Sequence, residues 1–322
     1  MGTANMNVVV GVDMGGTMIK LGLIYEGRLV AQASLAASSH INPNARLSEI
    51  GDKVDALLRE HDATPTGIGI AFPGIIDTEQ YKVLSKYVKY PDAQDVDFAT
   101  WAMERWRIPV ALENDAKAAL VGEWRFGSGK GANDLVLITL GTGVGSAVMI
   151  DGKVLSGRNF IAGNLGGHMT INLHGVLCNC GNIGCVETEG STWALVDAVR
   201  SAPQFVRSSL AKESDINYKN VFVHAAAGDL LATEIRDKSL RAWSLGIINL
   251  IHAFDPERIV IGGGIMESHD VLLPAVRGMI TTHSWVKDNP PELLAATHPH
   301  TAALLGMYYV LTEGKTTRTT IL

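Results

Sequence analysis

Residues 8–24 read VVVGVDMGGTMIKLGLI, and residues 135–150 read LVLITLGTGVGSAVMI. Each stretch is a strand-like apolar run, a turn of Gly and Thr, and a second strand-like run. This weak internal repeat suggests two similar domains that face one another across a cleft. The rest of the chain alternates strand and helix patterns, which is typical of the α/β class. Further strands are predicted at residues 67–72, 110–112 and 258–261, and helices at residues 47–61, 97–106, 117–126, 192–198 and 233–254.

Composition narrows the class of protein. The chain of 322 residues is long enough for about two domains, and 47% hydrophobic with 19% charged residues is ordinary for a soluble globular protein. A net charge of −6 argues against a dedicated nucleic-acid surface, which needs clustered Lys and Arg. Residues 1–12 lack the features of a signal peptide, and no apolar run is long enough to span a membrane. We therefore expect a cytoplasmic protein without membrane or nucleic-acid partners.

The first turn, DMGGT, has the composition of a phosphate-binding loop. Gly15 and Gly16 would let backbone N–H groups approach a phosphate, and Thr17 would supply a hydroxyl. Asp13 is a candidate ligand for Mg²⁺, through water, because hard cations prefer oxygen ligands. A plain hairpin explains the same residues, since Gly is the default residue of tight turns.

Two later glycine turns also suit a nucleotide. Gly141, Thr142 and Gly143 form a second candidate phosphate loop, again with a hairpin as the alternative. Gly263 and Gly264 follow the predicted strand at residues 258–261 and precede a helical segment, as at a nucleotide-binding edge or in an ordinary strand-to-helix turn. Neither GxGxxG nor GxxxxGK[ST] occurs, which disfavours a Rossmann dinucleotide site and a P-loop.

All the cysteines of the chain lie in the run CNCGNIGC. Cys178, Cys180 and Cys185 follow His168, and three thiolates with one imidazole complete a tetrahedral zinc shell. A shell with four protein ligands has no open position for water, so this zinc would be structural. Gly181 and Gly184 would let the backbone turn tightly around the ion. The alternatives are a disulfide with one thiol left over, or three unrelated buried cysteines.

A candidate base lies in VALENDAKAALVGEW, where a short strand ends and a helix begins. Asp115 at that junction has the position of a general base that accepts a hydroxyl proton during phosphoryl transfer. Asn114 beside it offers an amide suited to sugar hydroxyls. An N-cap is the commonest reason for Asp at such a junction, so a purely structural role stays open.

Together these residues resemble the ROK family of sugar kinases and sugar-responsive repressors. The resemblance runs from Val8 to about Leu311, and the string G-H-x9-C-x-C-G-x-x-G-C-x-E is its most specific part. It is carried by the motifs GVDMGGT, GIAFPGIID, LENDAKAA, LGTGVGSAV, GHMTINLHGVLCNCGNIGCVE and DPERIVIGGGI.

The resemblance implies a fold of two actin-like (ribonuclease H-like) domains across a cleft, with a structural zinc loop. Residues 1–116 and a C-terminal helix at about residues 301–322 would form the smaller domain. Residues 117–300 would form the larger one, with the zinc motif and the adenosine-side motif.

The resemblance also implies an activity and roles for particular residues. The activity would be ATP-dependent phosphorylation of a sugar hydroxyl, at C6 of a hexose such as glucose or of an N-acetylhexosamine. Asp115 would be the general base, while Asn114, Glu187 and His168 would contact the sugar, with His168 also a zinc ligand. ATP, Mg²⁺ and Zn²⁺ would be bound, and a homodimer or higher homo-oligomer is expected.

Two departures from the family pattern concern the phosphates and the sugar. Met18 stands where family kinases commonly have Lys after DxGGT, so a basic side chain near the phosphates is missing unless Lys20 serves. The family's E-x-G-H appears here as Leu165-Gly166-Gly167-His168, and Asn164 replaces the Glu only if the loop carries one extra residue. The identity of the sugar is therefore open.

Two alternatives to a kinase remain. One is a catalytically weak sugar sensor, suggested by Met18 and the altered E-x-G-H loop. The other is a sugar-responsive repressor, which we do not expect because the first predicted strand starts by Asn7.

Overall fold

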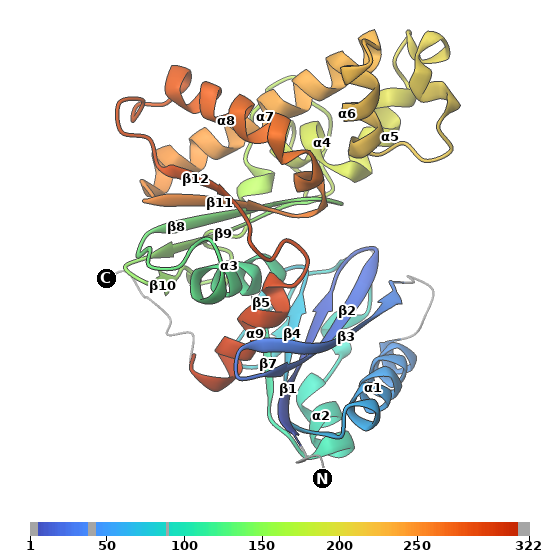
Figure 1. The fold of residues 1–322 in the computed structure, drawn as a ribbon, viewed down its shortest axis with the longest axis vertical. Coiled ribbons are helices and arrows are strands. Elements are labelled where there is room, and N and C mark those ends of the chain that lie inside the picture. Colours follow the sequence, from blue (N-terminus) through green and yellow to red (C-terminus); the bar gives the residue numbers. More distant parts are fainter. Residues whose placement is uncertain (1–5, 38–42, 88–89, 315–322) are drawn as a thin grey trace. The chain divides into compact units, whose positions relative to one another are not determined.

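The protein has the predicted α/β fold in a computed structural model that describes residues 6–37, 43–87 and 90–314 (Figure 1). Chain contacts divide it into two compact units. The first unit comprises Met1–Gly131, Lys153–Ala162 and His300–Leu322, and the second comprises Ala132–Gly152 and Gly163–Pro299. The predicted division after residue 116 lies inside a helix of the first unit, and residues 1–5 and 315–322 of the predicted smaller domain lie outside the described residues.

The first unit contains a five-stranded sheet in the order β3-β2-β1-β4-β7. Strands β1 and β2 form an antiparallel hairpin across the first glycine turn, β3 continues it, and β4 and β7 run parallel to β1. The carboxyl ends of β1, β4 and β7 therefore lie at one edge of the sheet. The strands are β1 (Met6–Met14), β2 (Met18–Tyr25), β3 (Arg28–Ala36), β4 (Ala63–Phe72) and β7 (Val110–Asn114), with a small hairpin of β5 (Ile76–Asp77) and β6 (Lys82–Val83).

Helices cover both faces of this sheet. Successive strand residues point to opposite faces, so each strand presents one set of residues to the helices on each side. On one face, Val8 and Val12 of β1 join the core with Ile50 of α1. On the other face, Gly11 lies against Leu304 of α9, where a Cβ on Gly11 would contact the Leu304 side chain. The helices of this unit are α1 (Pro43–Glu60), η1 (Ala93–Asp95), α2 (Phe98–Trp106), α3 (Asp115–Phe126) and α9 (Ala302–Thr312).

The second unit repeats the hairpin of the first. Strand β8 (Leu135–Leu140) and strand β9 (Val144–Ile150) are antiparallel across the second glycine turn, and β11 (Arg258–Gly262) and β12 (Glu292–Ala295) extend the sheet in parallel from β8. The helices are α4 (Val186–Gly190), α5 (Thr192–Arg200), α6 (Tyr218–Ala226), α7 (Leu230–Phe254) and α8 (His269–His283), with short 3₁₀ turns η2 (Gly166–His168), η3 (Phe205–Arg207), η4 (Ser209–Lys212) and η5 (Gly264–Ser268). The short strand β10 (Lys153–Val154) lies beside β9 at the edge of this sheet.

The predicted strands and helices are confirmed, with some elements missed. Strand β3 was not predicted, because three of its apolar residues are Ala, which is depleted in strands, and the strand is mostly exposed or half-buried. Helix α6 begins inside the stretch around residues 201–220, whose patterning is weak. Among the described helices, none combines the length and the apolar character that crossing a bilayer requires.

Candidate active site and zinc cluster

The first glycine turn joins the carboxyl end of β1 to the start of β2. The register of the hairpin places Asp13 directly opposite Lys20, and the Lys20 Nζ lies 3.3 Å from the Asp13 Oδ2. Burial raises the pKa of Asp13, and the Lys20 ammonium partly offsets this effect. Lys20 thus brings a positive charge to the turn that Met18 does not supply.

Gly15 is required by the close packing of this turn. A Cβ on Gly15 would lie 2.7 Å from the carbonyl oxygen of Met18, too close for any other residue without a backbone shift. Thr17, which is exposed, accepts at its carbonyl a hydrogen bond of 2.9 Å from the Ala37 N–H at the end of β3. The turn is therefore a defined loop beside the carboxyl end of β1.

Asp115 is the first helical residue of α3, and Asn114 caps the helix in its place. The Asn114 Oδ1 accepts the Lys117 N–H at 3.1 Å, whereas the Asp115 Oδ1 accepts from the Ala116 N–H at 2.8 Å. The purely structural N-cap reading of Asp115 is therefore wrong. Burial, and secondarily the nearby Asp13 carboxylate, raise the pKa of Asp115 to about 6.

The Asn114 amide is held from several sides. Its Nδ2 donates to the Gly74 carbonyl at 2.9 Å and to the Asp115 Oδ1 at 3.1 Å. Both amide hydrogens are thereby used, and the Oδ1 can accept one further hydrogen bond. Behind it, the buried Glu113 and Lys117 stabilise each other's charge: burial raises the pKa of Glu113 and lowers that of Lys117, and their attraction opposes both shifts.

The other two glycine turns lie together in the second unit. Strands β8 and β11 are parallel neighbours with Thr139 opposite Gly262, so their following turns share one edge of the sheet. Gly263 has a φ of +93° and packs against the carbonyl of Leu140, where a Cβ would not fit. The predicted residues Gly141, Thr142, Gly143, Gly263 and Gly264 are thus brought to a single edge.

Glu187, predicted to contact the sugar, lies beside the second glycine turn. Its Oε2 accepts the Val144 N–H at 2.9 Å and its Oε1 accepts the Trp193 Nε1–H at 3.1 Å. A Cβ on Gly143 would lie 2.6 Å from the Glu187 Oε2. Glu187, which lies in α4, therefore stabilises the second glycine turn.

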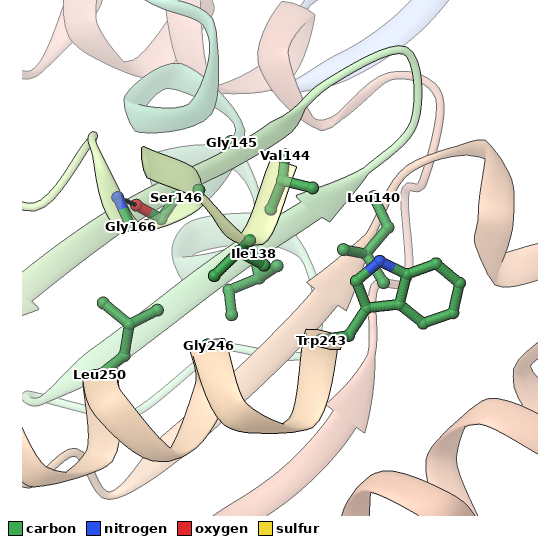
Figure 2. A pocket seen from close by; sticks show the side chains of 11 residues that line it. Ile138, Leu140, Val144, Gly145, Ser146, Gly166, Trp243, Gly246 and Leu250 are labelled. Atoms are coloured by element: carbon green, nitrogen blue, oxygen red, sulfur yellow. Dashed lines mark hydrogen bonds between the residues drawn. The ribbon is translucent and has the colours of Figure 1, made fainter. Parts of the chain in front are cut away.

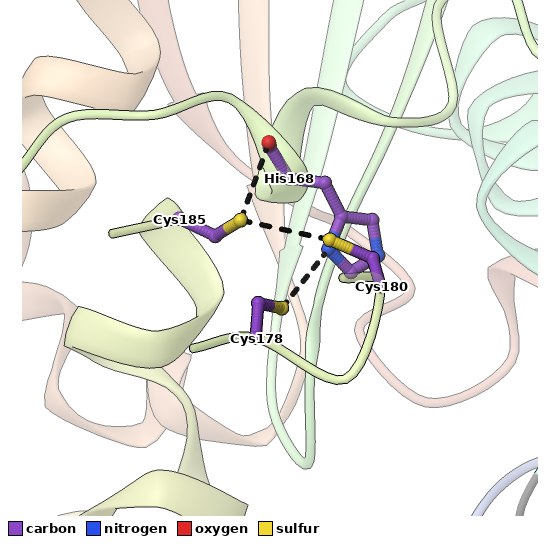
Figure 3. A group of neighbouring side chains, drawn as sticks. All are labelled: His168, Cys178, Cys180 and Cys185. Carbon is purple, nitrogen blue, oxygen red and sulfur yellow. Dashed lines mark hydrogen bonds between the residues drawn. The ribbon is translucent and has the colours of Figure 1, made fainter. Parts of the chain in front are cut away.

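The His and Cys side chains predicted to bind zinc converge on one point (Figure 3). The Cys178 Sγ lies 3.6 Å from the His168 Nδ1, the Cys180 Sγ lies 3.7 Å from the Cys185 Sγ, and all four candidate ligand atoms are within 4.8 Å of one another. In a tetrahedral shell with Zn–S of about 2.3 Å and Zn–N of about 2.0 Å, ligand atoms are roughly 3.5 to 3.8 Å apart. The cluster fits a zinc ion.

The loop around this cluster has the expected tight turns. Gly181 and Gly184 both have positive φ, at +88° and +61°, and a Cβ on Gly184 would collide with the Asn172 carbonyl. Burial raises the pKa of the Cys178 and Cys185 thiols and so disfavours their thiolates. A bound cation would favour the thiolates instead.

The segment that replaces the family's E-x-G-H turns Asn164 inward. Asn164 is 8% exposed, whereas Leu165 is 36% exposed. Ser146 holds this segment, because its hydroxyl donates to the Gly163 carbonyl at 2.7 Å and accepts the Gly166 N–H at 2.8 Å. Asn164 is thus buried in this segment, whereas its neighbour Leu165 is partly exposed.

A small apolar cavity in the second unit carries no such chemistry. It lies between β8, β9 and α7 and is lined mainly by apolar side chains, including Ile138, Val144, Trp243 and Leu250 (Figure 2). Its polar groups are the Ser146 hydroxyl, nearby backbone and the Trp243 indole N–H, which donates to the Gly190 carbonyl. We regard it as a packing gap in the core.

Sequence reasoning missed one residue at the first turn and placed another only conditionally. The residue named only conditionally is Lys20. Its position opposite Asp13 follows from the hairpin register, in which Met14 pairs with Ile19 and Asp13 with Lys20. Tyr90, whose hydroxyl donates to the Gly15 carbonyl, has no local signal because it is 75 residues away.

Comparisons with known proteins agree with this fold. A glucokinase of Thermotoga maritima is 31% identical over 315 residues, 95% of this chain and 97% of that enzyme. The crystal structure of a ROK family glucokinase from Streptomyces griseus, in complex with glucose and AMPPNP, matches with a TM-score of 0.77 at 28% identity, over 94% of this chain and 98% of that one. A xylose repressor of Bacillus subtilis is 27% identical over 310 residues, 94% of this chain and 77% of the repressor.

The ROK family profile spans residues 9–313, almost the whole of the described chain. This confirms the resemblance drawn from the glycine turns and the Cys/His string. The protein belongs to the ROK family.

Proposed function

We propose that this protein transfers the γ-phosphoryl group of ATP to a sugar hydroxyl, with Asp115 as the general base. The observation that carries the proposal is the Asp115 carboxyl, which follows β7 in the same unit as the Asp13 turn and has a pKa of about 6. A base is most effective when its pKa lies near the working pH, because it is then both ionised and basic. Glucokinase relatives support phosphorylation of a sugar as the reaction.

The glycine turns and Asp13 would bind the nucleotide. Backbone N–H groups at Gly15, Gly16 and Thr17, and at the turn of residues 141–143, would contact the phosphates, with Gly263 and Gly264 on the adenosine side. Asp13 would hold Mg²⁺ through water, and the ion would neutralise charge on the phosphates. Lys20 would add a second positive charge at this point.

The sugar would be a hexose phosphorylated at C6, such as glucose, or an N-acetylhexosamine. Asn114, Asn164, His168 and Glu187 are the proposed contacts. Asn164 would take the place of the family Glu if the loop carries one extra residue, and an uncharged contact there would weaken the assignment to glucose in particular. The relative with bound glucose and AMPPNP supports the substrate class.

Zinc would be structural in this proposal. His168, Cys178, Cys180 and Cys185 would complete its shell. When bound, the ion would make the loop rigid, and His168 would be held in one orientation towards the sugar.

A regulator that senses a sugar is the second candidate. The similarity to a xylose repressor over 94% of this chain favours it. Turnover separates the two functions, because a sensor binds a sugar without consuming ATP.

An ADP-release assay tests the proposal, with ATP and Mg²⁺ against hexoses, ketohexoses, N-acetylhexosamines and disaccharides. We expect strong turnover on one sugar, and a loss of at least about 100-fold in Asp115→Asn. Asp97→Asn is the matched control, because Asp97 is an exposed N-cap of α2 and Asn caps equally well. A zinc-loaded wild-type protein that turns over none of these sugars would favour the sensor, and an active Asp115→Asn would remove Asp115 as the base.

A further inference from the structure

A tyrosine distant in sequence holds the backbone of the first glycine turn. The Tyr90 hydroxyl donates a hydrogen bond of 2.9 Å to the carbonyl oxygen of Gly15, 75 residues earlier in the chain. Both residues belong to the first unit. The contact reaches the turn that the proposed function assigns to the phosphates.

The position of Tyr90 is fixed by ring contacts and by backbone hydrogen bonds. It is 8% exposed, and its ring centroid lies 5.3 Å from that of Phe72 at the end of β4 and 6.0 Å from that of Tyr87. Its N–H donates to the Tyr87 carbonyl, and its carbonyl accepts the Ala93 N–H at the start of η1. Burial raises the pKa of Tyr90 well above its usual range, so the hydroxyl stays a hydrogen-bond donor at any working pH.

Anchoring one carbonyl fixes the neighbouring N–H. In a trans peptide the C=O of one residue and the N–H of the next point in opposite directions, and the described chain contains no cis peptide bond. With the Gly15 carbonyl facing Tyr90, the Gly16 N–H faces away from it. This restraint matters in a Gly-Gly pair, because glycine peptides reorient more freely than any others.

The second glycine turn is held by the same kind of contact. The Gly141 carbonyl accepts the Thr192 N–H at 3.0 Å, and the Thr142 carbonyl accepts the Trp193 N–H at 3.2 Å. There the donors are backbone groups at the start of α5, whereas in the first turn the donor is a side chain. Both predicted phosphate loops thus have carbonyls fixed from outside the loop.

We propose that Tyr90 is a positioning residue for nucleotide binding: it holds the Gly15–Gly16 peptide so that the Gly16 N–H faces the phosphates. The inference rests on the proposed binding of ATP at this turn.

The test is the affinity for AMPPNP with Mg²⁺, measured by titration calorimetry in the absence of sugar. Tyr90→Phe keeps the ring and removes only the hydroxyl, and we expect its Kd for AMPPNP to rise about tenfold. Tyr218→Phe is the control, because the buried Tyr218 hydroxyl also makes one hydrogen bond of 2.9 Å, to the Ser239 hydroxyl in the second unit. It should bind AMPPNP like the wild type.

Kinetics separate positioning from general stability. Tyr90→Phe should raise the KM for ATP by a similar factor and leave the KM for the sugar unchanged, while the two Phe variants lose similar thermal stability. Equal AMPPNP affinity in Tyr90→Phe and the wild type would overturn this inference alone. A wild-type protein that binds no AMPPNP would overturn both the inference and the proposed function.

Discussion

Asp115 and Asp13 are carboxyl groups whose ionisation the fold opposes. Burial raises the pKa of both, and each also lies within the electrostatic influence of a neighbour: Asp13 raises the pKa of Asp115, and Lys20 lowers that of Asp13. At the residue scale, the pKa values of these two carboxyl groups are therefore set by their burial and by the charges next to them.

The raised pKa of Asp115 predicts the pH dependence of turnover. Only the ionised carboxylate accepts a proton, so log(kcat/KM) should rise with a slope of about one below pH 6 and level off above it. Initial rates between about pH 5 and 8 measure this. A profile that stays flat through pH 6 would contradict the role of Asp115.

Lys20→Met should weaken binding of ATP with Mg²⁺. Without the ammonium, burial acts unopposed on Asp13, its pKa rises further, and the KM for ATP should increase about tenfold. Adding Met18→Lys should restore part of the loss, because residues 18 and 20 of β2 point to the same face. Lys53→Met, which removes an exposed lysine of α1, should have no effect, and an unchanged KM in Lys20→Met would exclude the role of Lys20.

At the scale of elements, the zinc loop has little regular structure of its own. Between η2 and α4 the described backbone is joined by the isolated bridges Thr170–Cys185 and Leu177–Ile183. Several apolar side chains there are exposed, so no core holds the loop together. They include Leu173, Val176, Leu177 and Ile183. A metal can supply the stability that such a small segment lacks.

Cys180→Ser should therefore lose zinc and stability together. We expect metal analysis to show about one zinc per wild-type chain and none in the variant, and Tm to fall by about 5 °C. The sugar KM should rise as His168 loses its fixed orientation. Asn179→Ala changes the adjacent exposed residue and should keep the ion, whereas a wild-type protein free of zinc would contradict the site.

At the scale of the molecule, the proposed residues are distributed over both units. Asp13, Asn114 and Asp115 belong to the first unit, and Glu187 and the zinc cluster belong to the second. The proposed reaction needs contributions from each. The cleft between domains, the homodimer and the cytoplasmic location stay predictions.

The free energy of unfolding should show that the ionised Asp115 carboxylate destabilises the folded protein. Its pKa is about 6 in the folded protein, against the ordinary Asp value of 3.8 in the unfolded chain, so the unfolded chain releases the proton first and stability falls as pH rises from about 4 to 6. Asp115→Asn cannot ionise and keeps the acceptor for the Ala116 N–H. At pH 7 it should be more stable than the wild type by up to about 3 kcal/mol, less where water reaches the group.

Urea unfolding at two pH values measures this difference. The advantage of Asp115→Asn should shrink by about half at pH 5, because the wild-type carboxyl is then mostly protonated in the folded protein. A variant that is less stable than the wild type at pH 7 would show that the carboxylate is stabilised by contacts rather than strained by burial.

Short-range patterns were enough for much of the site. The spacing of Cys178, Cys180 and Cys185 predicted a cluster that the structure brings together with His168, and the two glycine turns predicted the paired hairpins. These features depend on residues close together in sequence, whose geometry the backbone limits strongly. Strand β3 was missed because three of its apolar residues are Ala, a weak strand signal, and its strand conformation depends on pairing with β2.

The sequence by itself determined the α/β class, the family, the glycine turns and the Cys/His set proposed to bind zinc, because each is encoded in short motifs of neighbouring residues along the chain. Only the tertiary structure decided that Asn114 rather than Asp115 caps α3, that Lys20 faces Asp13, and that Asn164 turns inward. It also brought Tyr90 to Gly15 across 75 residues. Contacts of this kind, and the burial that shifts a pKa, exist only once distant segments pack together.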